Sequence, residues 1–261
     1  MRVIIKDTYD DCSVWVAGYI ADKINAFRPA ADRPFVLGLP TGSTPVGTYQ
    51  ELIKLYQAGK ISFENVISFN MDEYVGLGRE SPQSYYNFMH EIFFNHIDIK
   101  TENINIPDGM ASDPVKECDE YEEKIKLCGG IHLFFCGIGA NGHIAFNEPG
   151  TSLSSRTRVK RLAANTREDN ARFFDGDIDA VPRLALTVGV GTVMDAGEVL
   201  LMANGGHKAE ALRQAVEGGV NHMCPASVLQ MHQHALVVCD DEASRRFSVR
   251  IAEYFNEVEH S

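Results

Sequence analysis

The chain has few cysteines, and none of them lies in a paired motif. Its 261 residues include six cysteines, at positions 12, 118, 128, 136, 224 and 239, with no CxxC spacing among them. Zinc sites and disulfide frameworks depend on patterned cysteines, so the spacing argues against both. Most of the six lie in apolar runs, where a thiol packs as a small hydrophobic side chain. We therefore expect reduced core cysteines in a cytoplasmic protein.

Long apolar runs and an excess of positive charge are also lacking. No stretch approaches the roughly 18 apolar residues that cross a bilayer, and the start of the chain, residues 1–6, turns polar too soon for a signal peptide. The 36 acidic residues outnumber the 24 basic ones, which gives a net charge of −12. This balance argues against nucleic acid and anionic membranes as partners. An anionic small molecule would need a local cluster of positive groups.

Apolar runs of strand length alternate with helical periodicity along most of the chain. The runs show no polar alternation, which is typical of strands that are buried on both faces. Helices are expected between them, with starts after Thr8, after Thr44 with Pro45 as the first helical residue, at 81–82 and at 113–114. The expected strands cover residues 3–5, 35–39, 66–69, 103–106, 131–136, 199–202 and 235–239.

This alternation predicts an α/β fold in a single domain over residues 1–261. We expect one doubly wound, mainly parallel sheet with helices on both faces, in a Rossmann-like arrangement. The arginine-rich stretch 154–179 has weak periodicity and is expected to form loops and short helices. Repeats and low-complexity segments are absent from the sequence.

A glycine-rich turn follows the run 131–136. Its sequence, GIGANGH, delivers His143 at its end, and Glu148 lies five residues further on. Open α/β sheets bind ligands outside the carboxyl ends of their strands, and a histidine with a carboxylate suits proton transfer near neutral pH. A plain glycine-rich loop remains the alternative for this stretch alone.

A second strand end, residues 40–44, has the composition of an anion cradle. Thr41, Ser43 and Thr44 supply hydroxyl groups, Gly42 supplies backbone freedom, and the next helix supplies unpaired N–H groups. No GK[ST] sequence follows, so a nucleoside triphosphate is not implied. A capped helix without a ligand is the alternative.

Two further strand ends carry charged groups. Lys208 lies in a first helical turn, where the helix dipole disfavours a cation unless an anion is bound; a surface lysine is the alternative. Asp72 is placed to act as a general base, although Asp72 or Glu73 could instead cap the turn. Together the four strand ends suggest proton transfer on a sugar phosphate, with no metal and no redox cofactor.

Several segments, in chain order, resemble the glucosamine-6-phosphate deaminase (glucosamine-6-phosphate isomerase) family. The resemblance runs from the first expected strand to the last helix, and the combination is far more specific than any lone glycine motif. The segments are LPTGSTP at 39–45, FNMDEYVG at 69–76, GHIAFNEP at 142–149, SRTR at 155–158, ALTVGVG at 185–191 and VNHM at 220–223.

The resemblance implies that glucosamine 6-phosphate and water become fructose 6-phosphate and ammonia, with no cofactor. Asp72 would take the proton from C2 and return it at C1, and His143, oriented by residues 141 and 148, would assist ring opening. Ser43, Thr44, Arg172 and Lys208 would hold the phosphate. Arg172 would belong to a mobile lid over 162–185.

The chain departs from the family pattern at position 141, where Asn141 stands in place of the usual aspartate. Asparagine can orient the histidine but carries no charge, so a lowered rate or a shifted pH dependence is expected. Asn141 could also be a tolerated variant in an active enzyme, with Glu148 alone supporting the histidine. A sugar-phosphate-binding protein of low turnover because of Asn141 is one alternative function, and a sugar-phosphate lactonase of the same fold is the other.

The resemblance also implies a homo-oligomer, a hexamer in many relatives, and activation by N-acetylglucosamine 6-phosphate. An ordinary solvated or interface cluster is the alternative for the basic residues concerned. The candidate allosteric residues are Thr151, Ser152, Arg158, Lys160, Arg161 and Tyr254.

Overall fold

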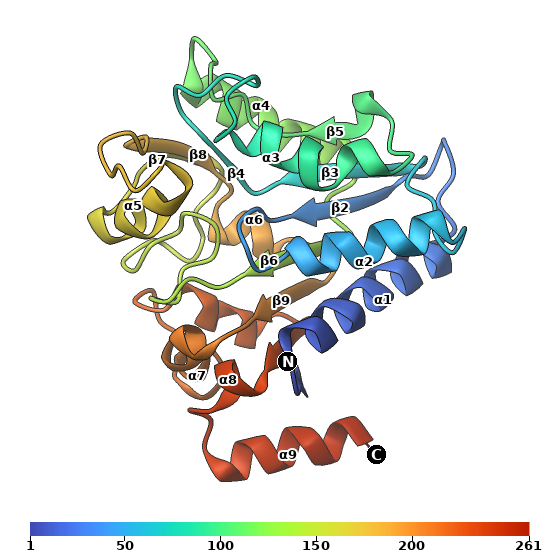
Figure 1. The fold of residues 1–261 in the computed structure, drawn as a ribbon, viewed down its shortest axis with the longest axis vertical. Helices are drawn as coiled ribbons and strands as arrows, with labels where there is room; N and C mark the ends of the chain where they lie inside the picture. Colours follow the sequence, from blue (N-terminus) through green and yellow to red (C-terminus); the bar gives the residue numbers. More distant parts are fainter. Residues whose placement is uncertain (261) are drawn as a thin grey trace.

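A parallel sheet crosses the middle of the molecule (Figure 1). The computed structural model describes residues 1–260, apart from the side chains of Asn165, Asp169, Asn256, Glu259 and His260. Every neighbouring pair of strands in this seven-stranded sheet is parallel. In spatial order the strands are β1 (Arg2–Lys6), β10 (Ala235–Asp240), β9 (Val199–Ala203), β6 (Leu133–Gly137), β2 (Phe35–Leu39), β3 (Val66–Asn70) and β5 (Ile104–Asn105).

Helices cover both faces of the sheet, as the unalternating strands predicted. Side chains alternate between the faces, so that Val36 belongs to one core cluster and Leu37 to the other. One cluster packs under α1 (Tyr9–Phe27), α2 (Val46–Gln57) and α3 (Tyr85–Ile92). The other packs under α4 (Pro114–Leu127), α6 (Val190–Met194), α7 (Ala209–Glu217), α8 (Asp241–Ser244) and α9 (Val249–His260). The doubly wound parallel sheet is confirmed.

The order of the strands determines where a ligand can bind. From β2 the chain moves outward through β3 to β5, then returns to β6 on the other side of β2. The connections therefore diverge between β2 and β6, and this topological switch point opens a crevice at the carboxyl ends of the strands.

A small second sheet was not predicted. It is antiparallel and consists of β4 (Asp72–Tyr74), β8 (Leu184–Thr187) and β7 (Arg158–Arg161). The expectation of loops and short helices over 154–179 is therefore wrong at β7, and right at α5 (Ala164–Asn170) and the 3-10 turn η3 (Ala171–Phe173). The strand β7 is mostly charged, so the apolar run that marks a buried strand is missing there.

Two predicted helix starts are wrong. The helix expected at 81–82 begins at Tyr85, after the N-cap Ser84, whose side chain accepts a hydrogen bond from the N–H of Asn87. The N-cap of α2 is Pro45 and not Thr44. The hydroxyl of Thr44 donates instead to Asn204 Oδ1 at 2.8 Å, across the crevice. Such a long-range partner is not visible in a local capping pattern.

The remaining short helices are 3-10 turns between the main elements. They are η1 (Phe94–His96), η2 (Thr101–Asn103), η4 (Gly206–Lys208) and η5 (Pro225–Met231).

Five of the six cysteines are buried and all six are free thiols. Among the described residues, no helix combines the length and apolar character needed to span a bilayer.

Candidate active site

A cavity of about 580 Å³ opens at the switch point between β2 and β6. Its floor comes from the segments that follow β2, β3 and β6, and η4 adds a further wall. The segment containing α5 and η3, at the left of Figure 1, covers it from outside the strand ends. The volume lies within the range of small-molecule sites.

Residues 40–44, the predicted anion cradle, line this cavity. Gly42 has a φ of +93°, a backbone conformation that glycine adopts at little cost. Tyr9, from α1, holds the turn: its hydroxyl accepts from the N–H of Gly47 at 2.8 Å and lies 3.1 Å from the carbonyl oxygen of Thr44. The cradle is therefore braced from behind before any ligand binds.

Positive groups gather around the cradle. His207 and Lys208 reach the cavity from η4, and Arg172 reaches it from η3. Arg172 lies over the ring of Phe173, 4.7 Å from its centroid. Lys208 and Arg172 are cations from segments far apart in the sequence, and they supply the local positive charge that an anion needs in a chain of net charge −12.

Asp72 lies at the bottom of the cavity and is only 6% exposed. Burial, helped by the charge of the neighbouring Glu73, raises its pKa from 3.8 to about 8, although a hydrogen bond with Thr41 opposes the rise. The Thr41 side chain, predicted as part of the phosphate cradle, therefore also contacts the candidate base. A carboxylate with a raised pKa in a ligand cavity has the properties of a general base.

Glu73 has the capping role that the sequence left open between the two carboxylates. Its carboxylate accepts hydrogen bonds from the N–H groups of Tyr74, Tyr85 and Tyr86 at 2.8, 3.0 and 2.8 Å. Burial nevertheless raises the pKa of Glu73 to about 7. Glu73 therefore anchors the start of α3 and leaves Asp72 to face the cavity.

His143 ends a tight turn that begins after β6. The N–H of Gly139 donates to the His143 carbonyl at 2.9 Å, and the imidazole ring lies against Gly139. A Cβ atom at position 139 would overlap the ring, so this glycine is required by close approach. The turn thereby presents the imidazole to the cavity.

Glu148 lies beside this histidine. Its Oε2 atom is 3.8 Å from His143 Nδ1, and the carboxylate is largely buried. The segment between them is attached to β8: the N–H of Phe146 donates to Thr187 Oγ1 at 3.1 Å, and Asn147 Nδ2 donates to the Val188 carbonyl at 2.8 Å. The small antiparallel sheet therefore positions the histidine–carboxylate pair.

Asn141 contacts both members of the pair. Its Nδ2 donates to Glu148 Oε2 at 2.7 Å, and its Oδ1 accepts from the main-chain N–H of His143 at 3.2 Å. An aspartate could not donate in this way while ionised, so this hydrogen bond to Glu148 depends on the amide of Asn141. The four predicted catalytic residues, Asp72, Asn141, His143 and Glu148, lie around one site.

The wall of the cavity is aromatic, which sequence reasoning did not predict. Tyr74, Tyr85, Phe146 and Phe174 line it and pack on one another. Two hydrogen bonds tie α5 to this region: Asn170 Nδ2 donates to the Tyr74 hydroxyl at 2.9 Å, and the Thr166 hydroxyl donates to Glu148 Oε1. Tyr74 lies in the FNMDEYVG segment, which was the one available signal.

Comparison with known proteins identifies the family. The sequence profile described as glucosamine-6-phosphate isomerases/6-phosphogluconolactonase matches residues 8–238. The chain belongs to this family. It is 58% identical over 259 residues to a glucosamine-6-phosphate deaminase of Treponema denticola, covering 99% of this chain and 96% of the relative. It is 57% identical over 261 residues to one of Glaesserella parasuis, covering 100% and 99%.

Solved structures of family members agree with the fold. A structure described as a monomeric glucosamine-6-phosphate deaminase superimposes with a TM-score of 0.90 at 44% identity, covering 94% of this chain and 99% of that one. A 6-phosphogluconolactonase from Trypanosoma cruzi has a TM-score of 0.74 at 19% identity, with coverage of 95% and 97%. At that identity the likeness to the lactonase shows the fold alone.

Family membership bears on position 141. The lowered rate expected from Asn141 finds no support, because relatives that are similar to this chain over nearly its whole length are named deaminases.

Within the described residues, no group of three or more His, Cys, Asp or Glu side chains is arranged to hold a metal ion.

The candidate allosteric residues are not all brought together. Thr151 and Ser152 lie in the loop before β7, whereas Arg158 and Lys160 lie on β7 and share one side of it. Arg161 follows on the opposite side of that strand. Tyr254 is on α9, at the other end of the molecule in Figure 1. Within one chain, Tyr254 therefore lies apart from the other five residues.

Proposed function

We propose that this protein converts glucosamine 6-phosphate and water to fructose 6-phosphate and ammonia. The single observation that carries the proposal is the cavity itself, because the buried Asp72 carboxylate, the His143–Glu148 pair and the residues of the proposed anion cradle lie around one space. Relatives named glucosamine-6-phosphate deaminase at 57–58% identity support the same substrate.

The residues divide the reaction between them. The phosphate binds in the cradle of Thr41, Gly42, Ser43 and Thr44, with Lys208 and Arg172 as counter-charges. His143, oriented by Glu148 and Asn141, moves the proton that opens the sugar ring. The open aldose then has a C2 hydrogen next to its carbonyl group.

Asp72 completes the isomerisation. Its carboxylate takes the C2 proton while a proton of the substrate's ammonium group passes to the C1 oxygen, which gives an enolamine with a C1–C2 double bond. Asp72 then returns its proton to C1. The C2–nitrogen bond then becomes an imine, which water hydrolyses to the ketone of fructose 6-phosphate and ammonia. The buried site favours proton transfer because a carboxylate of raised pKa is both a stronger base and a ready donor.

The Asp72→Asn variant tests this function. We expect ammonia release from glucosamine 6-phosphate to fall at least about a thousandfold, whereas fructose 6-phosphate should still bind because the cradle is intact. Asp195→Asn, the same change at an exposed ion pair with Arg156, is the matched control. Unchanged turnover in Asp72→Asn would exclude the proposed base. No ammonia from the unmodified protein would favour the lactonase or the binding-protein alternative.

Position 141 gives a second test. The unmodified protein should release ammonia from glucosamine 6-phosphate, because Glu148 lies beside His143 and accepts a hydrogen bond from the Asn141 amide. The carboxylate added in Asn141→Asp favours the protonated imidazole, so the pH dependence of kcat should move to higher pH in the variant. A pH series of both proteins measures this, and activity in the Asp variant alone would mean that Asn141 disables the site.

Residues 162–185 are proposed as a lid. Thr166, Asn170, Arg172 and Phe174 from this segment line the cavity, so substrate must pass them. Amide hydrogen exchange should slow within this segment when fructose 6-phosphate is added. Equal exchange with and without the ligand would contradict the lid.

Regulation by N-acetylglucosamine 6-phosphate is proposed at the basic side of β7. Thr151 is buried with no hydrogen-bond partner for its hydroxyl among the described residues, and burial lowers the pKa of Arg158. An anion there would be favoured by both cations, Arg158 and Lys160. We expect the activator to lower the substrate concentration at half-maximal rate, and Lys160→Gln to abolish this effect.

A cytoplasmic location is proposed because all six cysteines are free thiols.

A further inference from the structure

Glu148 is held at both of its oxygen atoms, by different parts of the chain. Oε2 accepts from Asn141 Nδ2 at 2.7 Å and lies beside His143. Oε1 accepts from the hydroxyl of Thr166, which belongs to α5. Both Glu148 and Thr166 are buried, at 7% and 5% exposure. Burying a carboxylate oxygen without a hydrogen-bond donor costs free energy, so each of the two bonds stabilises the position of the Glu148 carboxylate.

We propose that Thr166 is a positioning residue for His143, acting through Glu148; this inference rests on the proposed function. The terminal torsion of a glutamate is soft, and one hydrogen bond alone leaves the carboxylate plane free to rotate. With Oε1 bonded to Thr166, Oε2 stays on the side of His143. Without that bond, the 3.8 Å approach between Oε2 and Nδ1 is no longer maintained.

The place of Thr166 in the chain makes this bond conditional. Glu148 follows β6 and is attached to the small sheet, whereas Thr166 comes from the segment that covers the cavity. The bond can therefore form only when α5 lies over the cavity. The histidine–carboxylate pair is thereby completed at the moment when the substrate is covered.

A second contact of α5 allows positioning to be separated from simple attachment. Asn170 Nδ2 donates to the hydroxyl of Tyr74 at 2.9 Å, one turn further along the helix, without touching Glu148. Loss of the bond between Asn170 and Tyr74 should weaken the attachment of α5, while both oxygen atoms of Glu148 stay hydrogen-bonded. If Thr166 served only to attach α5, its loss would have the same kinetic signature as the loss of Asn170.

Steady-state kinetics with glucosamine 6-phosphate, together with calorimetric binding of fructose 6-phosphate, test the inference. Thr166→Val keeps the side-chain shape and removes the hydroxyl; kcat should fall about tenfold or more, with less than about a threefold change in ligand affinity. Thr166→Ser restores the hydroxyl and should recover most of kcat. Asn170→Ala should mainly weaken ligand affinity.

Thr192→Val is the matched control. It removes a threonine hydroxyl from another buried carboxylate, Glu122, at 2.5 Å and outside the cavity, so kcat should stay near that of the unmodified protein. If Thr166→Val does not fold, Thr166→Ala takes its place in the same comparison.

Three results would overturn the inference. Thr166→Val could match the unmodified protein in kcat, or Thr166→Ser could be as slow as Thr166→Val. Thr166→Val could also reproduce the pattern of Asn170→Ala, which would leave only attachment of α5. In each case the unmodified protein still releases ammonia. Its failure to do so would instead refute the proposed function, and with it the inference.

Discussion

Ionisation of Asp72 lowers the free energy of unfolding of the protein. Its pKa is raised from 3.8 to about 8, chiefly by burial, so between these values the unfolded chain loses its proton before the folded one does. The contribution of Asp72 to the free energy of unfolding therefore falls as pH rises from about 4 to about 8. The carboxylate needed for proton transfer thus destabilises its own fold.

Asp72→Asn should consequently stabilise the protein, and more so at alkaline pH. We expect a gain on the order of a few kcal/mol in the free energy of unfolding at pH 8.5, and little gain at pH 4. Urea denaturation at the two pH values measures the difference. An equal effect at both would show that ionisation is not its cause.

Gly139 makes room for the imidazole of His143. An alanine methyl group there would overlap the ring, which would have to turn away from the cavity. Gly139→Ala should therefore lower ammonia release by about a hundredfold or more, the usual contribution of a displaced acid–base group. Affinity for fructose 6-phosphate should change little, because the cradle lies on another loop. Gly219→Ala, where the added methyl group meets no atom within 4 Å, is the control.

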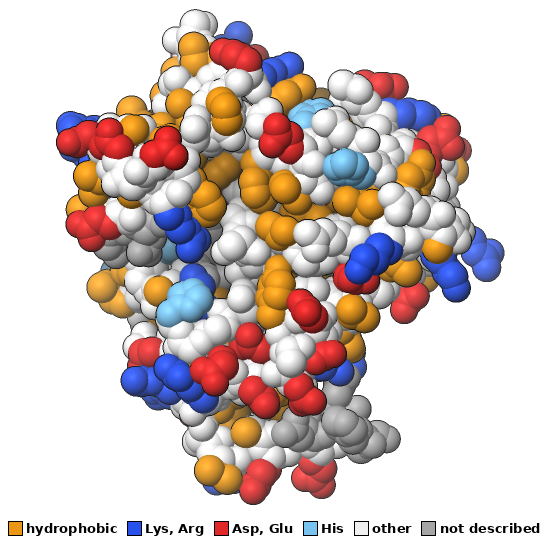
Figure 2. All heavy atoms as spheres, in the orientation of Figure 1, with side chains coloured by type: hydrophobic (Ala, Val, Ile, Leu, Met, Phe, Trp, Pro, Cys, Tyr) orange, Lys and Arg blue, Asp and Glu red, His pale blue; other side chains and the backbone are white. Residues whose placement is uncertain are grey.

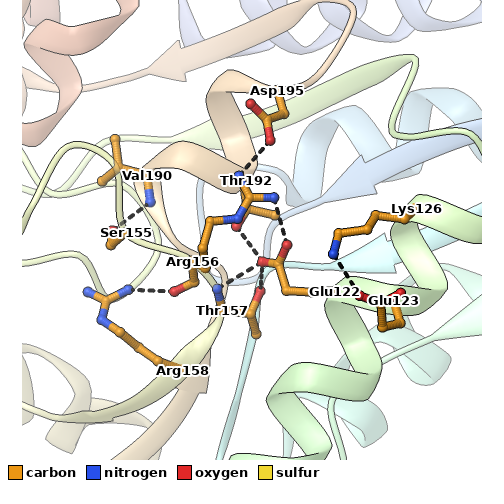
Figure 3. Close-up of polar contacts among 10 residues, drawn as sticks. All are labelled: Glu122, Glu123, Lys126, Ser155, Arg156, Thr157, Arg158, Val190, Thr192 and Asp195. Carbon is orange, nitrogen blue, oxygen red and sulfur yellow. Dashed lines mark hydrogen bonds and ion pairs between the residues drawn. The ribbon is translucent and has the colours of Figure 1, made fainter.

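Among the structural elements, α4 has an unusual link to the small sheet. Figure 3 shows Glu122, on α4, pointing at residues of the segment that enters β7 and at α6. Thr157 donates to Glu122 from its N–H at 2.8 Å and its hydroxyl at 2.6 Å, and Arg156 donates at 2.8 Å. Arg156 also reaches Asp195 at 2.5 Å. Burial opposes ionisation of Glu122, but these hydrogen bonds outweigh it and lower the pKa.

Glu122→Ala should cost about 3 kcal/mol in the free energy of unfolding, since it leaves the buried donors of Thr157 and Thr192 without an acceptor. Because the folded pKa lies below the ordinary 4.5, the stabilisation is present above about pH 4.5 and lost as pH falls through the folded value. Chemical denaturation between pH 3 and 7 measures it. A variant as stable as the unmodified protein at pH 7 would contradict this role.

At the scale of the whole molecule, the surface determines charge and assembly. Acidic and basic side chains are interspersed on the face drawn in Figure 2, and the net charge of −12 favours solubility. The resemblance predicts a hexamer, whereas the 44%-identical relative of known structure is described as monomeric. Apolar side chains exposed on the single chain, such as Met223 and Leu184, are suited to contacts between copies.

The resemblance to the family predicts that light scattering coupled to size exclusion gives the mass of six chains. The mass of one chain, at concentrations where the protein is active, would contradict the hexamer and would leave any activation to sites within a single subunit. Met223→Asp tests where the copies touch, and Asp195→Asn, an exposed charge change elsewhere, is its control. Dissociation of the Met223→Asp variant alone would place Met223 at the contact between copies.

The sequence by itself determined the large sheet and the strand ends. Strands such as 35–39 and 199–203 are apolar on both faces, and only a sheet covered by helices on both sides buries them. Their carboxyl ends must share one edge, so the cradle at 41–44, Asp72, His143 and Lys208 were predictable as neighbours. These inferences need only local pattern and the geometry of a parallel sheet.

The tertiary structure alone decided the partners of each side chain. Thr44 bonds Asn204, 160 residues away, and not its own helix; Glu73 holds the start of α3; and Thr166 reaches Glu148 from the covering segment. The pairing of the charged strand β7 with β8 was likewise decided by the tertiary structure. Such contacts depend on which segments the fold brings face to face, and a hydroxyl or carboxylate has several acceptable local partners until the packing selects one.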